Sequence, residues 1–123
     1  MKLFVSGKWE DKLRVRKVHK ELIELGHEIT YDWTTGEFID NREHLAGLAD
    51  NDITGVKECD KLVTLLFVDY PYKGVWVEFG IALALNKEII IVGDYGKDCI
   101  FINHPNVTVL NTLKELYEYL KGK

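Results

Sequence analysis

Residues 61–93 read KLVTLLFVDYPYKGVWVEFGIALALNKEIIIVG, and the order of patterns in this stretch decides the fold. Residues 61–68 form a nearly continuous apolar run, as expected for a strand covered on both faces of a sheet. In the next segment, residues 73–87, the only charge from Val75 to Leu85 is Glu78, which is typical of a helix buried on more than one side. Residues 88–93 form a second apolar strand, so the stretch predicts two parallel strands joined by a right-handed helical crossover.

The rest of the chain repeats this alternation of strands and helices. Strands are also expected at 2–6, 28–33 and 107–110, and helices at 10–25, 42–58 and 112–120. Asp11 and the pair Thr112 and Glu115 fit helix starts, and Gly26 fits a helix end. We therefore expect a single α/β domain over residues 1–123, with a five-stranded parallel sheet in a three-layer α/β/α arrangement. Ligands of such folds bind at the carboxyl ends of the strands, which here means segments 6–9, 31–35 and 68–74.

Composition limits the classes of partner and environment. Hydrophobic residues make up 46% of the 123 residues and charged residues 29%, as in soluble globular proteins. The formal net charge of −4 argues against a nucleic-acid polymer as partner. The apolar runs are too short to span a membrane, and the charge at Lys8 interrupts any signal-peptide layout. Cys59 and Cys99 lie far apart and the four histidines lack ligand spacing, so we expect a cytoplasmic protein without metal or cofactor.

Asp52 occupies an unusual position on the expected helix 42–58. Successive residues of a helix turn by about 100°, which places Asp52 in the middle of an apolar face and Asp50 on the opposite side. This apolar face consists of Leu45, Leu48, Ala49 and Val56. An acid that points with the apolar residues needs a reason, and function is one. The alternative is an acid near a helix end that caps the helix or reaches solvent.

Glu78 is expected on the second turn of the helix that follows a central strand, facing the crevice at the strand ends. The alternative is a glutamate satisfied by backbone N–H groups near the helix start. Two carboxylates in one crevice suit acid–base or nucleophilic chemistry at a sugar carbon, where bond cleavage passes through an oxocarbenium-like transition state. Different degrees of burial separate the pKa values of Glu78 and Asp52, and hence their roles.

Aromatic and polar residues gather at the same strand ends. Tyr31 and Trp33 flank Asp32, so a planar base can stack there while Asp32 bonds its edge, although ordinary packing is the commoner explanation for any single aromatic. The other aromatics of this rim are Trp9, Tyr70 and Tyr72. Ser6 and Gly7 can bring backbone N–H groups to a hydroxyl or phosphate. The cations Lys8, Arg42 and Lys73 either meet a phosphate or are simply solvated. Neither a dinucleotide fingerprint nor a Walker loop is present.

Four segments together resemble one family. They are SG at 6–7, YDWT at 31–34, an aspartate eight residues before Asp60, and the run GVWVEFGIALALNK at 74–87. This combination resembles the nucleoside 2-deoxyribosyltransferase superfamily, whose relatives include 2'-deoxynucleoside 5'-monophosphate N-glycosidases. The resemblance implies a flavodoxin-like fold and cleavage of the N-glycosidic bond of a (deoxy)nucleoside or its 5'-monophosphate, with the sugar passed to another base or to water.

The resemblance also implies roles for individual residues. Glu78 matches the nucleophile, and Asp52 matches an aspartate near the sugar and base, while Asp60 is mainly structural. Family members commonly form homodimers or larger homo-oligomers in which a neighbouring subunit completes the site, and Asn103 is the candidate for that contribution. No cofactor is implied.

The loop before Glu78 departs from the family pattern. Transferases often carry an aspartate six residues before the nucleophile, where this chain has Tyr72, and the nearest acid is Asp69. Nucleotide hydrolases often hold a phosphate with serine and glycine in this loop, which here offers Lys73 and Gly74. Hydrolysis and transfer therefore both stay open. A non-catalytic nucleotide-binding module and an NAD-cleaving enzyme are the alternative functions.

Overall fold

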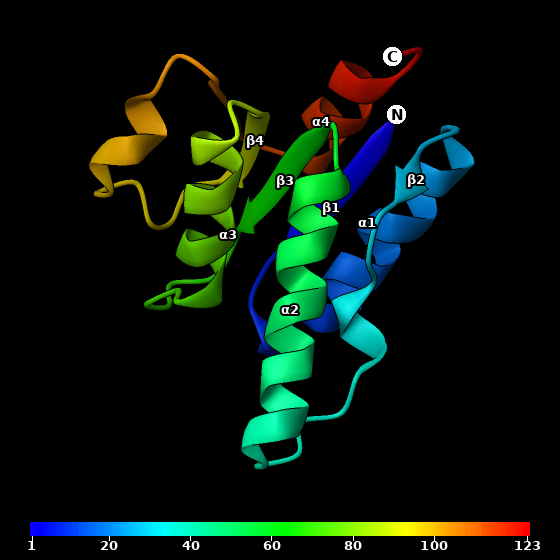
Figure 1. Ribbon diagram of the computed structural model, residues 1–123. Helices are drawn as coiled ribbons and strands as arrows, with labels where there is room; N and C mark the ends of the chain where they lie inside the picture. The colour runs from blue at the N-terminus through cyan, green and yellow to red at the C-terminus, as the bar shows by residue number, and fades with distance from the viewer.

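The computed structural model describes residues 1–123 and contains one sheet of five parallel strands in the order β2-β1-β3-β4-β5 (Figure 1). The strands are β1 (Lys2–Ser6), β2 (Glu28–Ile29), β3 (Lys61–Leu66), β4 (Glu88–Gly93) and β5 (Val107–Leu110). Every neighbouring pair is parallel. This strand order is that of flavodoxin-like folds, in which the order of the strands reverses at the neighbouring pair β1 and β3. The predicted α/β class and parallel sheet are confirmed.

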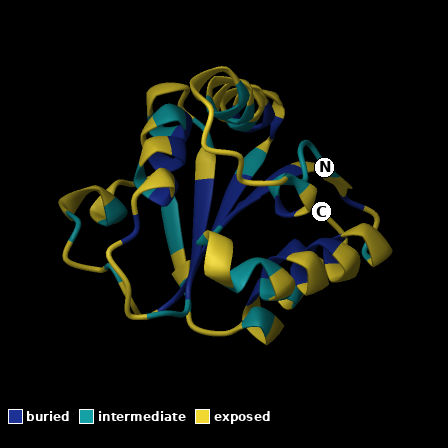
Figure 2. Cartoon of the chain, turned by 90° about the horizontal axis from the view of Figure 1, so that it is seen from below, coloured by how far each residue is buried: buried dark blue, intermediate teal, exposed yellow.

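Helices cover both faces of the sheet, and the buried strands between them appear dark blue in Figure 2. They are α1 (Lys12–Glu24), α2 (Arg42–Glu58), α3 (Gly74–Ala84) and α4 (Leu113–Leu120). One apolar core lies between the sheet and α1 with α4, and the other lies between the sheet and α2 with α3. Three short 3-10 turns complete the chain: η1 (Trp9–Asp11), η2 (Trp33–Thr35) and η3 (Ile100–Asn103). None of the helices combines the length and hydrophobicity of a membrane span.

Local chemistry explains where the helices begin and end. The Asn41 side chain caps α2 by accepting a hydrogen bond from the His44 N–H at 3.0 Å. Thr112 caps α4 in the same way, through the Glu115 N–H at 3.1 Å. Gly26 follows α1 with a φ of 96°, a conformation that a residue with a Cβ rarely adopts. Asp11 occupies the N-cap position of α1, as predicted, but its side chain accepts no capping hydrogen bond, and the turn η1 precedes the helix.

The second strand is much shorter than the predicted range of 28–33. Only Glu28 and Ile29 pair with β1, and the chain then bends away into η2. Asp32 stabilises this bend, since its Oδ1 accepts a hydrogen bond from the Thr34 N–H at 2.9 Å. A short side chain that bonds the backbone two residues ahead favours a turn over a strand. The bend places Trp33 beside the carboxyl end of β1, where its Nε1–H donates to the Val5 carbonyl at 2.7 Å.

Candidate active site

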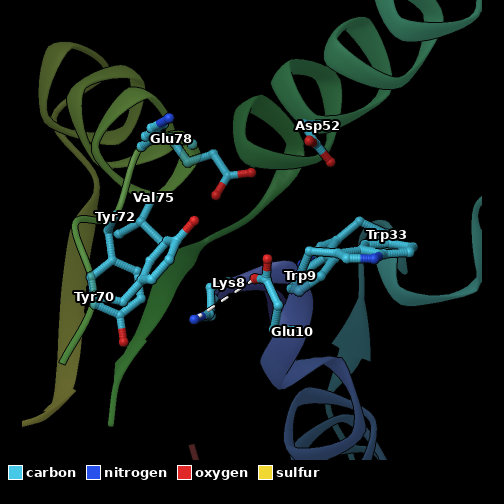
Figure 3. Close-up of a pocket in the computed structure, with 12 residues that line it drawn as sticks. Lys8, Trp9, Glu10, Trp33, Asp52, Tyr70, Tyr72, Val75 and Glu78 are labelled. Atoms are coloured by element: carbon cyan, nitrogen blue, oxygen red, sulfur yellow. Dashed lines mark ion pairs between the residues drawn. The ribbon is translucent and has the colours of Figure 1, made fainter. Parts of the chain in front are cut away.

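A cavity of about 310 Å³ lies at the carboxyl ends of β1 and β3 (Figure 3). The loop after β1 contributes Gly7 to Glu10, and the loop after β3 contributes Tyr70, Tyr72 and Lys73. Asp52 reaches the cavity from α2, and Gly74, Val75 and Glu78 reach it from α3. This is the edge of the sheet at which parallel α/β folds bind ligands, because the loops and helix starts there converge around the central strands.

Glu78 lines the cavity from α3. Glu78 is buried, with 8% of its surface exposed to solvent. Its Oε1 accepts a hydrogen bond from the Ser6 hydroxyl on β1. Burial raises the pKa of Glu78 to about 8, the nearby Asp52 carboxylate adds to the rise, and the Ser6 hydrogen bond opposes it. Glu78 therefore holds a proton far more tightly than an ordinary glutamate, while one of its oxygens is fixed in place.

Asp52 faces the same space from α2, and Figure 3 shows both carboxyl groups directed into the cavity. Its Oδ1 is buried and makes no hydrogen bond. Burial raises the pKa of Asp52 to about 6. A carboxyl oxygen that is withdrawn from water and left without a partner is available to a ligand hydroxyl or amino group. Asp50, two residues earlier, is exposed, as its place on the helical wheel predicts.

Two pairs of aromatic rings line the cavity on different sides. Trp9 and Trp33 lie with ring centroids 6.3 Å apart, and Tyr70 and Tyr72 with centroids 6.1 Å apart. The Tyr72 hydroxyl also accepts a hydrogen bond from the Val68 N–H at 3.1 Å, which fixes the loop after β3. The rings offer apolar faces to a flat ligand. Glu78 and Asp52 extend toward the rings from helices α3 and α2 (Figure 3).

Lys8 is the most enclosed cation of the cavity, with a side chain that is 13% exposed. Its Nζ lies 3.5 Å from the centroid of the Tyr70 ring and 3.8 Å from a carboxylate oxygen of Glu10. Lys73 lines the same cavity at the start of α3. No local pattern selects Glu10, because it lies in a polar segment and its contact with Lys8 depends on the turn η1.

Most of the residues selected from the sequence meet at this cavity, although their roles stay predictions. They are Ser6, Gly7, Lys8, Trp9, Trp33, Asp52, Tyr72, Gly74 and Glu78. Four others lie elsewhere. Tyr31 packs against the core beneath α2, and Asp32 bonds Thr34 in η2. Asp69 lines a neighbouring cavity, and Asn103 is exposed on η3, where its side chain donates to the Ile100 carbonyl.

The fold and the cavity together define a class: α/β/α proteins of flavodoxin-like topology that carry carboxyl groups in a pocket beside the central strands. Residues 3–112 match the sequence model of a family described as nucleoside 2-deoxyribosyltransferase. The chain belongs to this family of enzymes that cleave N-glycosidic bonds. No curated protein matches the chain's sequence.

Solved structures agree with this assignment. A 2-deoxyribosyltransferase from the psychrotolerant bacterium Bacillus psychrosaccharolyticus superposes with a TM-score of 0.78 and 17% identity, over 97% of this chain and 92% of that one. The CMP N-glycosidase BcmB of Clostridium botulinum superposes with a TM-score of 0.66 and 25% identity, over 98% of this chain and 95% of that one. The first likeness shows the shared fold.

Proposed function

We propose that the protein cleaves the N-glycosidic bond of a (deoxy)nucleoside or nucleoside 5'-monophosphate and passes the sugar to water or to a second base. The observation that carries this proposal is the pair of carboxyl groups, Glu78 and Asp52, which face one cavity with raised pKa values. Family membership and the likeness to a nucleotide N-glycosidase support the same reaction. Glu78 is the proposed nucleophile and Asp52 the proposed acid and base.

In the first step, ionised Glu78 attacks C1' as the bond from C1' to the base nitrogen breaks. The electron pair of that bond leaves with the base, which takes a proton from Asp52. The product is a glycosyl ester on Glu78. Burial favours this role for Asp52, because a raised pKa keeps more of it protonated near neutral pH.

In the second step, water or the nitrogen of a second base attacks C1' from the face that the first base occupied. The attacking group passes its proton to the Asp52 carboxylate, and the electron pair of the ester bond returns to Glu78. Two successive displacements at C1' retain its configuration. The aromatic rings of Trp9 and Trp33 form the proposed base side, since a flat base stacks well on such faces.

The cations of the cavity favour a 5'-monophosphate over the free nucleoside as substrate. Lys8 is largely enclosed, and its single carboxylate partner, Glu10, is mostly exposed and 3.8 Å away. A phosphate group can replace that loose contact, with Lys73 as a second cation. Replacing Lys8 by methionine should therefore raise KM for nucleoside monophosphates at least tenfold and leave KM for nucleosides nearly unchanged. Equal effects on both substrates would contradict this assignment.

The decisive experiment is a chromatographic screen of nucleosides, nucleoside 5'-monophosphates and NAD for release of a base. Wild-type protein should release the base from at least one deoxynucleoside or deoxynucleotide, and Glu78→Gln should release none while remaining folded by circular dichroism. Glu58→Gln makes the same chemical change at an exposed position of α2 and should behave as wild type. Saturable binding without base release would favour the binding module, and release of nicotinamide alone would favour an NAD-cleaving enzyme.

We also propose that the protein is a homo-oligomer. The outward side of α3 is apolar, with Val77 62% and Leu85 47% exposed and no charge on this face. An apolar cavity of about 370 Å³ between α3 and η3 continues this surface. Asn103 on η3 then lies beside the proposed interface and is the residue proposed to reach a neighbouring site. Light scattering should give a dimer or larger species, and a monomer at assay concentration would contradict the proposal.

A further inference from the structure

The hydroxyl of Thr64 has no evident structural purpose. Thr64 lies in the middle of β3, is fully buried, and makes no hydrogen bond through its Oγ1. The next residues on the same face of the strand are Leu62 and Leu66, both in the apolar core. A buried hydroxyl without a partner destabilises a fold, and a valine has nearly the same shape without that penalty. Packing alone therefore does not explain a threonine at this position.

The nearest polar neighbour of Thr64 in the sheet is Ser6. The two residues are register partners on the adjacent strands β1 and β3. Alternate residues of a strand share a face, and Phe4 and Leu62 both belong to the core beneath α2 and α3. Ser6 and Thr64 therefore point toward those helices side by side. Neighbouring strands lie about 4.8 Å apart, so a hydrogen bond from Thr64 to Ser6 Oγ requires a different χ1 rotamer of Thr64, since Oγ1 has no partner in the observed one.

This arrangement rests on the proposed function, in which Glu78 attacks C1'. We propose that Thr64 is a positioning residue for Glu78: its hydroxyl pairs with that of Ser6, and the two hydroxyls together hold Glu78 Oε1. Ser6 already donates to this oxygen. With Oε1 held, Oε2 is the oxygen left to attack C1', so the hydroxyl pair selects the attacking atom.

Two hydroxyls serve this purpose better than one because the charge of Glu78 changes during the reaction. When Glu78 is ionised, Thr64 donates to Ser6 and Ser6 donates to Oε1. The two hydrogen bonds keep this direction in the glycosyl ester, because the carbonyl oxygen of the ester still accepts from Ser6. When Glu78 is protonated its O–H can donate to Ser6, and Ser6 then donates to Thr64 Oγ1. Hydroxyls that donate and accept can reverse in this way, and a chain of such bonds strengthens each member.

The test measures the pKa of Glu78 directly, by NMR of its carboxyl carbon against pH, with Glu78→Gln to assign the signal. The other charged groups around the cavity are Asp52 on α2, Lys8 and Glu10 after β1, and Lys73 before α3. All of them are unchanged in a variant of Thr64. Thr64→Val should raise the pKa of Glu78, Ser6→Ala should raise it further, and Thr64→Ser should restore the wild-type value. Thr108→Val removes a threonine hydroxyl from β5 and should leave the pKa unchanged.

Steady-state kinetics provide the second measurement. Thr64→Val should lower kcat roughly threefold with KM unchanged. The effect is small because the Thr64 hydroxyl only strengthens the hydrogen bond that Ser6 donates to Glu78. An unaltered pKa of Glu78 in Thr64→Val would overturn the proposal, whatever the activity. A protein that releases no base would instead contradict the proposed function, and the NMR titration would still decide whether Thr64 acts on Glu78.

Discussion

Asp52 and Glu78 present their carboxyl groups to one cavity from two different helices, α2 and α3. The charge of Asp52 raises the pKa of Glu78, in addition to the larger effect of burial. The two groups are therefore linked, because a proton bound by Asp52 removes the charge that raises the pKa of Glu78. Such a pair suits a reaction in which one carboxyl group attacks and the other carries a proton.

Replacing Asp52 by asparagine tests its proposed acid and base role. The amide keeps the shape of the side chain but carries no transferable proton, so kcat for base release should fall about 10²–10⁴-fold. Asp50→Asn makes the same change two residues earlier on the exposed side of α2 and should leave kcat as in wild type. Steady-state measurements of base release by the two variants give the two values of kcat to be compared. Equal rates in both would exclude a role for Asp52 in the reaction.

The pH dependence of activity should report both carboxyl groups of the cavity. Attack requires ionised Glu78, whose pKa burial raises to about 8, and base departure requires protonated Asp52, whose pKa burial raises to about 6. The fraction of protein with both groups in these states is largest near pH 7, midway between the two pKa values, so we expect a bell-shaped profile of kcat/KM that falls below about pH 6 and above about pH 8. Initial rates in overlapping buffers of constant ionic strength measure this. A rate that is flat from pH 5 to pH 9, or that still rises between pH 8 and pH 9, would contradict the assignment.

The same pKa makes a prediction about stability. The folded-state pKa of Glu78, about 8, lies above its ordinary value of 4.5, so the folded protein holds this proton more tightly than the unfolded chain. The stabilisation of the folded state by this tighter proton binding is complete below pH 4.5 and is lost as pH rises through about 8. The free energy of unfolding should therefore fall by a few kcal/mol between pH 5 and pH 8.5 because of this one group.

Urea denaturation at the two pH values measures the effect, and Glu78→Gln isolates it. Glutamine does not titrate, so the variant should lose less stability than wild type over the same interval. The difference between the two proteins reports Glu78 together with its effect on Asp52, because the remaining titrating groups are common to both. Parallel curves for the two proteins would mean that Glu78 is ionised in the folded state well below pH 8.

Gly55 allows α2 to approach the sheet closely, and so sets the depth of Asp52. A Cβ at this position would lie 2.8 Å from the ring of Phe4 and 2.9 Å from the Cβ of Tyr31. Gly55→Ala should therefore lower the free energy of unfolding by about 1–3 kcal/mol. Gly47→Ala, in the open part of the same helix, should raise it by about 0.5–1 kcal/mol. Thermal melts of both variants check the opposite signs.

Much of the fold could be predicted from the sequence because its elements carry strong, separate patterns. The apolar runs locate β3 and β4, and periodicity locates α2, although β3 ends at Leu66, before the predicted end at Val68. The second strand could not be predicted in length. The segment from Glu28 to Trp33 has the residue types of a strand, but the bend stabilised by Asp32 ends the pairing after Ile29. Competition between a side chain–backbone bond and a strand is decided by tertiary contacts, which a local pattern does not contain.

The site was predictable where helical geometry decides it. The wheel separates Asp52 from Asp50 without knowledge of the sheet, and the structure places the first in the cavity and the second in solvent. The hydrogen bond between Ser6 and Glu78 joins residues 72 positions apart and depends on the packing of α3 against the sheet. No local pattern reports such a contact. The proposed role of Asn103 concerns a neighbouring subunit, which the sequence of one chain does not position.

The most direct test of the central claim is to detect the glycosyl ester on Glu78. Wild-type protein mixed with its substrate and stopped in acid within one turnover should gain the mass of one sugar residue, and digestion should place that mass on the peptide containing Glu78. Glu78→Gln should gain none under the same conditions. A sugar adduct on a different residue, or base release by Glu78→Gln at the wild-type rate, would contradict the account.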